Sequence, residues 1–119
     1  MIKEKTKFKL ADNSGGKIAE CFHIYKASYG FPGVYILLSI KSIKTQSKIK
    51  KGLIYKGLII RTRFKFQRRN GTSIKFGDNG VVLLTKKNEL ISNRIFGPIA
   101  IELRKKNLLK ILSLSSTII

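Results

Sequence analysis

Five segments of the chain have the apolar patterns that are typical of β-strands. Apolar and polar residues alternate over residues 6–10, and less regularly over 18–25. Residues 34–43 and 53–62 are rich in Ile, Leu, Val and Tyr, and residues 81–84 form a short apolar run. The hydrophobic pattern therefore predicts five strands.

Clusters of Gly, Pro, Asn and Asp mark turns around these strands. They lie at residues 12–16, 31–33, 51–52, 70–71 and 77–80. No helix-length pattern separates the predicted strands, so the sequence favours a mainly β protein built on a small antiparallel barrel or sandwich. A barrel leaves no open sheet edge, which suits a chain this rich in β-forming residues.

Residues 61–76 predict a β-ribbon that carries positive charge. Arg61, Arg63 and Lys65 alternate with uncharged residues, so a continuous strand would place these three cations on one face. Asn70–Gly71 is a strong signal for a hairpin turn. Neither arm contains an acid, so we expect these cations to lack a carboxylate partner. The ribbon cations are Arg61, Arg63, Lys65, Arg68, Arg69 and Lys75.

The C-terminal quarter changes to a helical period. Pro98 is expected at a first helical position, and the spacing of the residues after it predicts a short helix. The next residues are apolar at helical spacing, and this part either packs on the barrel or ends in a short strand at 116–119. We expect a single domain over 1–119, with the barrel and ribbon at about 1–96 and the helical part at about 97–119.

The charge of the chain makes a polyanion the expected partner. Its 119 residues include 25 Lys and Arg against 6 Asp and Glu, a formal net charge of +19, yet 43% of them are hydrophobic. A disordered basic tail would be poorer in apolar residues, so we expect a buried core beneath a strongly positive surface. Nucleic acid and an anionic membrane are the two partners that would neutralise such a surface.

The positive charge is concentrated in the middle of the chain. Thirteen cations and no acid lie between Cys21 and Gly77. Ordinary domain surfaces mix both signs, so an acid-free stretch of this length indicates a binding surface. A loop at 44–51 adds lysines between two predicted strands, and lysine ammonium groups suit contact with phosphates. The lysines of this loop are Lys44, Lys48, Lys50 and Lys51.

Residues that enzymes and metal sites require are scarce. The chain has one cysteine and one histidine, which excludes a disulfide scaffold, a Cys-based zinc finger and a histidine cluster. Cys21 and His23 are two positions apart, so a regular strand would place both on one face, as a buried thiol beside a hydrogen-bonded imidazole. We therefore expect no enzyme activity, no cofactor and no metal.

The residues alone leave three kinds of function open. The first is an architectural protein of a ribonucleoprotein particle. The second is an independent binder of single-stranded nucleic acid, which predicts an exposed aromatic platform on one sheet face. The third is a cationic membrane-surface protein, which would need a basic amphipathic helix; residues 104–114 are the one short candidate. The first is favoured, and no membrane partner is expected.

Several motifs occur in order along nearly the whole chain. They are ADNSG at 11–15, KIKKG at 48–52, GLIIRT at 57–62, NRIFGP at 93–98 and KILSL at 110–114. With these motifs the chain resembles the universal large-subunit ribosomal protein fourteen family from end to end. The resemblance implies a five-stranded β-barrel with a protruding β-ribbon and a short C-terminal helical segment.

The resemblance also implies partners. Family members bind large-subunit rRNA on the intersubunit face of the large ribosomal subunit, beside large-subunit proteins of families three and nineteen. They touch small-subunit rRNA at an intersubunit bridge and offer a docking edge to a ribosome-silencing factor. By position, this docking edge includes Asn93, Arg94, Phe96 and Lys110. Charge and resemblance together give an expected rRNA-binding set of Lys17, Lys44, Lys48, Lys50, Lys51, Arg61, Arg63, Lys65, Arg68, Arg69 and Lys75.

The sequence departs from the family at a few positions and carries a hint of its origin. Val34 and Leu53 stand where the family usually has Asp, which raises the net charge, and Asn93 replaces the usual Thr. Ile and Lys are the two commonest residues, and their codons are A/T-rich. We therefore expect a gene translated inside a mitochondrion, with a plastid or a bacterial cytoplasm as the alternative.

Overall fold

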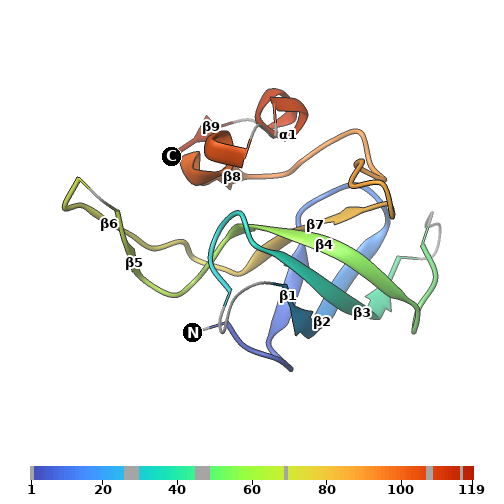
Figure 1. Ribbon diagram of the computed structural model, residues 1–119. Coiled ribbons are helices and arrows are strands. Elements are labelled where there is room, and N and C mark those ends of the chain that lie inside the picture. The colour runs from blue at the N-terminus through green and yellow to red at the C-terminus, as the bar shows by residue number, and fades with distance from the viewer. Residues whose placement is uncertain (1, 26–29, 45–48, 69, 107–108, 116) are drawn as a thin grey trace.

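The computed structural model has a closed β-barrel, a C-terminal layer packed on one side of it, and a ribbon that projects from it (Figure 1). The side chains of residues 104–106 and 109 lie outside the description. The residues that the structure describes are 2–25, 30–44, 49–68, 70–106, 109–115 and 117–119.

Five strands form the barrel: β1 (Lys7–Leu10), β2 (Gly16–Ile24), β3 (Tyr35–Ile43), β4 (Ile54–Arg61) and β7 (Gly80–Leu84). They are hydrogen-bonded in the order β1-β2-β3-β4-β7, and β7 pairs with β1 to close the ring. The predicted barrel is confirmed. All neighbours are antiparallel except β1 and β7, which run parallel. The prediction of a wholly antiparallel barrel is wrong at this pair, because an odd number of strands cannot alternate direction around a closed ring.

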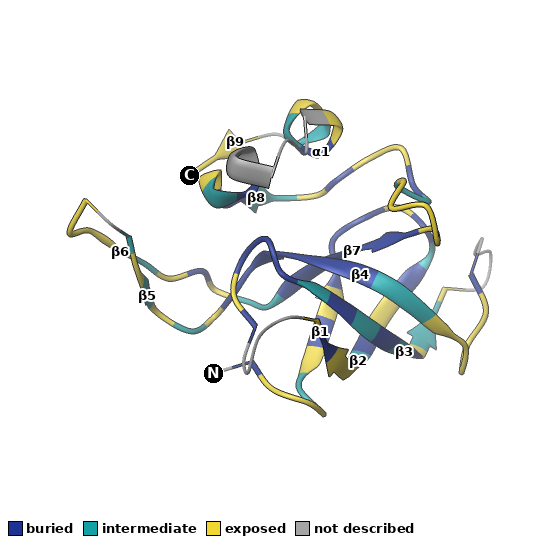
Figure 2. Ribbon diagram, viewed as in Figure 1, coloured by how far each residue is buried: buried dark blue, intermediate teal, exposed yellow. Residues whose placement is uncertain are grey.

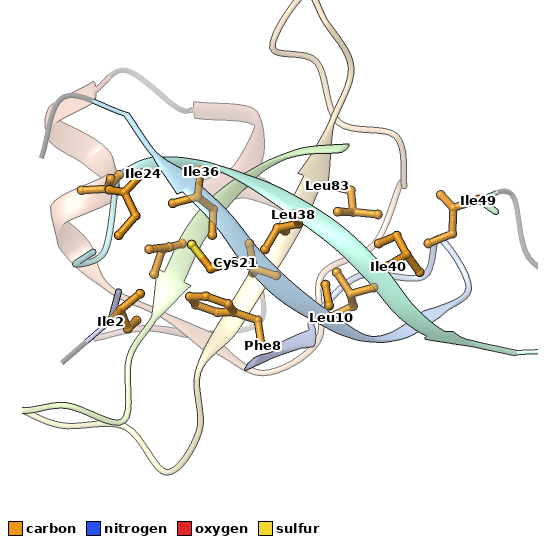
Figure 3. Packing of buried hydrophobic residues seen from close by; sticks show 14 residues of the cluster. Ile2, Phe8, Leu10, Cys21, Ile24, Ile36, Leu38, Ile40, Ile49 and Leu83 are labelled. Carbon is orange, nitrogen blue, oxygen red and sulfur yellow. The ribbon is translucent and has the colours of Figure 1, made fainter. Parts of the chain in front are cut away.

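Alternate residues of the strands fill the barrel interior. Ile36, Leu38 and Ile40 of β3 are completely buried, and Phe8 and Leu10 of β1 pack in the same cluster (Figure 3). Burying one such side chain contributes about 1.5–3 kcal/mol before the entropy of ordering it is counted. This cluster is the physical basis of the alternation along β1 and β3, because only one face of each strand points inward.

The strands β4 and β7 are buried on both faces, which explains their unbroken apolar runs. Leu58 and Val82 belong to a second hydrophobic cluster, with Ile99, Leu103 and Ile111 of the C-terminal segment. The C-terminal layer thus covers the side of the barrel formed by β4 and β7 (Figure 2).

The C-terminal layer combines two short helices with a small sheet. The strands β8 (Pro98–Ile99) and β9 (Thr117–Ile118) pair in parallel, and the 3-10 helix η1 (Ile101–Lys106) and α1 (Leu109–Leu114) lie between them in the chain. The predicted helical segment is confirmed, and the layer both packs on the barrel and ends in a strand. The prediction of Pro98 at a helix start is wrong, because this residue is paired in β8 and its carbonyl oxygen accepts a hydrogen bond from a β4 arginine.

The ribbon is a short hairpin of β5 (Phe66–Gln67) and β6 (Ser73–Ile74). Gly71 in its turn has a φ of 87°, a left-handed conformation that glycine adopts readily. The predicted hairpin is therefore confirmed. The predicted continuous strand from Arg61 is wrong, because β4 ends there and the chain bends before β5. As a result, Arg61 is buried while Arg63 is exposed, so the two do not share a face.

Cys21 and His23 do not share a face of β2. A register shift against β3 lies between them, since Cys21 pairs with Leu38 and His23 with the adjacent Leu37. This irregularity leaves Cys21 buried and His23 exposed, so the prediction of a buried Cys–His neighbourhood is wrong. Burial, followed by the nearby negative charge of Glu4, raises the pKa of the Cys21 thiol to about 11. The thiol is therefore protonated at neutral pH.

Candidate nucleic-acid interface

The 44–51 loop and the ribbon present most of their predicted cations to solvent (Figure 2). Two residues of the predicted rRNA-binding set, Lys48 and Arg69, lie outside the described residues. Arg61 and Arg68 are exceptions that the structure places in ion pairs. The remaining members are exposed: Lys17, Lys44, Lys50, Lys51, Arg63, Lys65 and Lys75.

The end of the 44–51 loop is fixed to the barrel. Ile49 is buried in the barrel core, and the backbone N–H of Lys50 donates to the Tyr55 hydroxyl at 3.3 Å. The Gly52 N–H donates to the Ile40 carbonyl at 2.9 Å. Lys50 and its neighbour Lys51 are exposed. The backbone that carries these two lysines is therefore anchored to the barrel.

Arg61 is a buried structural residue. Its Nε donates to Asp78 Oδ1 at 2.5 Å, and its Nη1 donates to the carbonyl oxygens of Phe96 and Pro98 at 3.0 and 3.2 Å. The guanidinium thus joins the end of β4, the segment before β7 and the entry to the C-terminal layer. With only 9% of its side chain exposed, Arg61 has no free face for RNA.

Two glycines make room for the Arg61 guanidinium. A Cβ atom on Gly80 would lie 2.8 Å from Arg61 Cγ, and a Cβ on Gly97 would lie 2.9 Å from Arg61 Nη1. Both distances are below those that real Cβ contacts show, so side chains at these positions would displace the arginine. The small residues and Arg61 therefore form one structural unit.

Arg68 ties the ribbon to the C-terminal layer. Its Nε donates to Glu102 Oε1 at 2.5 Å, and its Nη2 donates to the backbone oxygen of Ile119 at 2.6 Å. The expectation that ribbon cations lack carboxylate partners is thus wrong for Arg61 and Arg68. Their partners are Asp78 and Glu102, which come from segments outside the ribbon.

The ADNSG motif is explained by Asp12, which is buried. Its Oδ1 accepts from the Ser14 hydroxyl at 2.6 Å, and its Oδ2 accepts from the Leu83 N–H at 3.0 Å. The carboxylate fastens the turn after β1 to β7, so its role in this chain is structural.

A groove on the barrel surface brings together cations that are distant in sequence. Lys17, Lys44 and Arg63 line it together with Lys7 and Lys9 of β1. Lys7 and Lys9 were not among the predicted binding residues. The alternating pattern of β1 already indicated that both lysines point outward, since they occupy its polar positions.

The predicted partner-docking residues are exposed. The Asn93 amide group is fixed by Asn13, whose Nδ2 donates to Asn93 Oδ1 at 2.7 Å. The Arg94 guanidinium carbon lies 5.1 Å from the centroid of the Phe96 ring, and Phe96 is 42% exposed. Lys110 lies exposed on α1. Of these four residues, Phe96 also lines the groove.

Among the described residues, no three or more His, Cys, Asp or Glu side chains gather where they would hold a metal ion. Within the same part of the chain, no helix is long and apolar enough to cross a bilayer.

Comparison with known proteins gives matches that span the full length of the chain. A family model described as ribosomal protein L14p/L23e matches residues 1–119. The large ribosomal subunit protein uL14 of Carsonella ruddii (strain PV) is 43% identical over 122 residues, an alignment that covers 100% of both chains.

Proposed function

Because the chain belongs to the ribosomal protein L14p/L23e family, we propose that it binds large-subunit rRNA through its 44–51 loop and its 61–76 ribbon. Its membership makes it a structural constituent of the large ribosomal subunit, active in translation, and not an enzyme. The binding residues that we propose differ from the predicted set at Arg61 and Arg68. Both are left out, since each guanidinium is held in an ion pair and donates to backbone oxygens within the protein.

The observation that supports this proposal is the division of the basic residues into two groups. Arg61 and Arg68 hold the ribbon to the rest of the fold, whereas Arg63, Lys65 and Lys75 beside them stay exposed. The paired arginines fix where the exposed cations stand. Cations held in place in this way neutralise the phosphates of a folded RNA with less loss of side-chain and backbone freedom than a flexible tail would incur.

We further propose the partners that the family resemblance implies. Asn93, Arg94, Phe96 and Lys110 form the edge for a ribosome-silencing factor, and the neighbouring proteins belong to large-subunit families three and nineteen. Contact with small-subunit rRNA would follow from a place on the intersubunit face. The exposed ring of Phe96 and the guanidinium stacked on it are the features that support a protein-docking edge.

The cellular location remains a proposal as well. We propose a mitochondrial ribosome on the basis of the Ile- and Lys-rich composition, with a plastid or a bacterial cytoplasm as the alternative. The Carsonella relative is a bacterial protein, which supports the bacterial cytoplasm as the alternative. Fractionation of the native cell separates these locations: large subunits that contain this chain should sediment from purified organelles and be absent from the remaining cytoplasm.

Assembly into the large subunit tests the proposed interface. The variant R63A/K65A/K75A removes three exposed ribbon cations, and K41A/K86A/K87A removes the same charge from exposed positions outside the loop and ribbon. Tagged chains are expressed beside the native protein, and large subunits are washed in high salt and sedimented. We expect the ribbon variant to be depleted from the washed subunits and the control to remain. Equal retention of both variants would contradict the proposed ribbon contacts.

A further inference from the structure

We propose that the groove on the barrel surface binds a single-stranded segment of RNA, with phosphates on its lysines and a base against its apolar walls. This inference rests on the proposed function and extends the binding surface onto β1 and β2, beyond the loop and ribbon, which supply Lys44 and Arg63 to the groove. The groove has a volume of about 600 Å³ and lies along β1, bordered by residues from β2 and from the bend before β7. This volume falls within the ~300–1,000 Å³ range of clefts that bind small ligands, so one nucleotide fits.

The positive charge of the groove is not balanced by its acids. Five cations line it, and the two carboxylates beside them are those of Asp12 and Asp78. Asp12 is buried and accepts hydrogen bonds from Ser14 and Leu83, and Asp78 is paired with Arg61. Among the described residues, none of the five groove cations forms an ion pair: Lys7, Lys9, Lys17, Lys44 and Arg63.

The placement of Lys7 and Lys9 follows from the barrel. They alternate with Phe8 and Leu10, whose side chains are buried inside, so both ammonium groups point outward from the same strand. Two residues along a strand span about 6.6 Å, so the two lysines form a short row of charge rather than one point. A row of cations suits a chain of phosphates.

The groove also has apolar walls that are open to solvent. Ile18 is paired opposite Lys9 and is 42% exposed, and Phe96, which also lines the groove, is 42% exposed. An acidic peptide would use the lysines and leave these walls unused. A single strand of RNA offers both phosphates and the flat apolar faces of unpaired bases, whereas a duplex hides its bases. The combination therefore favours single-stranded RNA.

The binding test uses the whole protein, a 10-nucleotide oligouridylate and a 10-base-pair RNA duplex. The groove variant is K7A/K9A, and the matched control is K86A/K87A, which removes two exposed lysines from the turn after β7. The variant K7R/K9R keeps the charge. Each phosphate contact contributes about −0.7 to the slope of log affinity against log salt, so loss of two contacts makes the slope shallower by about 1.4. For each tenfold decrease in salt, the affinity of the variant for the oligonucleotide therefore falls behind that of the native protein by about 25-fold.

We expect this loss for K7A/K9A with the oligonucleotide, recovery in K7R/K9R, and changes under twofold for K86A/K87A. Phe96→Leu should weaken oligonucleotide binding about fivefold or more through lost stacking, and Phe22→Leu, at an exposed ring outside the groove, should not. Four results would each overturn the inference: no binding of the oligonucleotide by the native protein, equal losses in groove and control variants, equal losses with the duplex, or equally tight binding of a polyglutamate peptide.

Failure of this inference is distinguishable from failure of the proposed function. If K7A/K9A binds the oligonucleotide normally while K65A/K75A, a ribbon variant whose lysines are not part of the groove lining, is lost from washed large subunits, the groove proposal fails and the ribbon proposal stands. If the ribbon variant is retained in washed large subunits while the groove variant loses binding to the oligonucleotide, the ribbon proposal fails and the groove proposal stands.

Discussion

Replacing Arg61 should destabilise the fold, although this residue belongs to the most basic stretch of the chain. The variant Arg61→Met keeps much of the side-chain length and removes the guanidinium. Asp78 then loses its partner, and the carbonyl oxygens of Phe96 and Pro98 lose their donor. Breaking a buried ion pair costs about 3–5 kcal/mol. The Asp78 side chain is 37% exposed and regains water, so we reduce the expected loss to about 2–3 kcal/mol.

Thermal unfolding followed by circular dichroism measures this loss. At about 4 °C per kcal/mol for a chain of this size, the melting temperature of Arg61→Met should fall by about 10 °C. The neighbouring Arg63→Met removes an exposed guanidinium and should change stability by less than about 0.5 kcal/mol.

In RNA binding we expect the larger effect from Arg63→Met. This variant should make the slope of log affinity against log salt shallower by about 0.7, and folded Arg61→Met should leave the slope unchanged. Equal melting temperatures for the two variants, or a lower salt slope for Arg61→Met, would refute the division into structural and binding arginines.

Three further predictions concern glycine, aspartate and cysteine positions. Gly80→Ala places a Cβ against the Arg61 side chain, so its melting temperature should fall towards that of Arg61→Met. The double variant G80A/R61M should melt only slightly below Arg61→Met alone, because both changes disturb the same interaction. Asp12→Ala leaves the buried Leu83 N–H without an acceptor and should cost about 2–3 kcal/mol in urea unfolding; a loss under 0.5 kcal/mol would show that water replaces the carboxylate. The thiol of Cys21 has its pKa raised to about 11 from 9.0, so the unfolded chain releases this proton first as pH rises. Its contribution to stability is complete below pH 9 and is lost as pH rises towards about 11. Urea midpoints at pH 8 and pH 10 should therefore differ more for the native chain than for Cys21→Ala, and equal differences would contradict this origin.

Local pattern was enough to predict the barrel strands. Each strand has a buried face whose period appears directly in the sequence, as in Phe8 and Leu10 of β1. The hairpin turn was also predictable, because Gly71 takes a conformation that few other residues adopt. The parallel closure of β1 on β7 follows from strand number, a constraint on the whole ring that no single segment carries.

The roles of Arg61 and Arg68 were not predictable from the sequence. Their carboxylate partners lie 17 and 34 positions away, so a search for acids within the ribbon missed both. The irregularity that separates Cys21 from His23 likewise depends on pairing with β3 and leaves no sign in the β2 sequence. Charge density predicted an RNA-binding surface, but burial and pairing decide which of its cations are available to a ligand.

Site-specific photo-crosslinking in intact large subunits tests the central claim most directly. A photoreactive residue is placed at Lys50, at Lys65 and, as the control, at Lys87, all of which are exposed. We expect crosslinks from positions 50 and 65 to large-subunit rRNA, at yields well above those from position 87. Crosslinks from positions 50 and 65 to proteins alone would contradict the claim that these cations hold RNA.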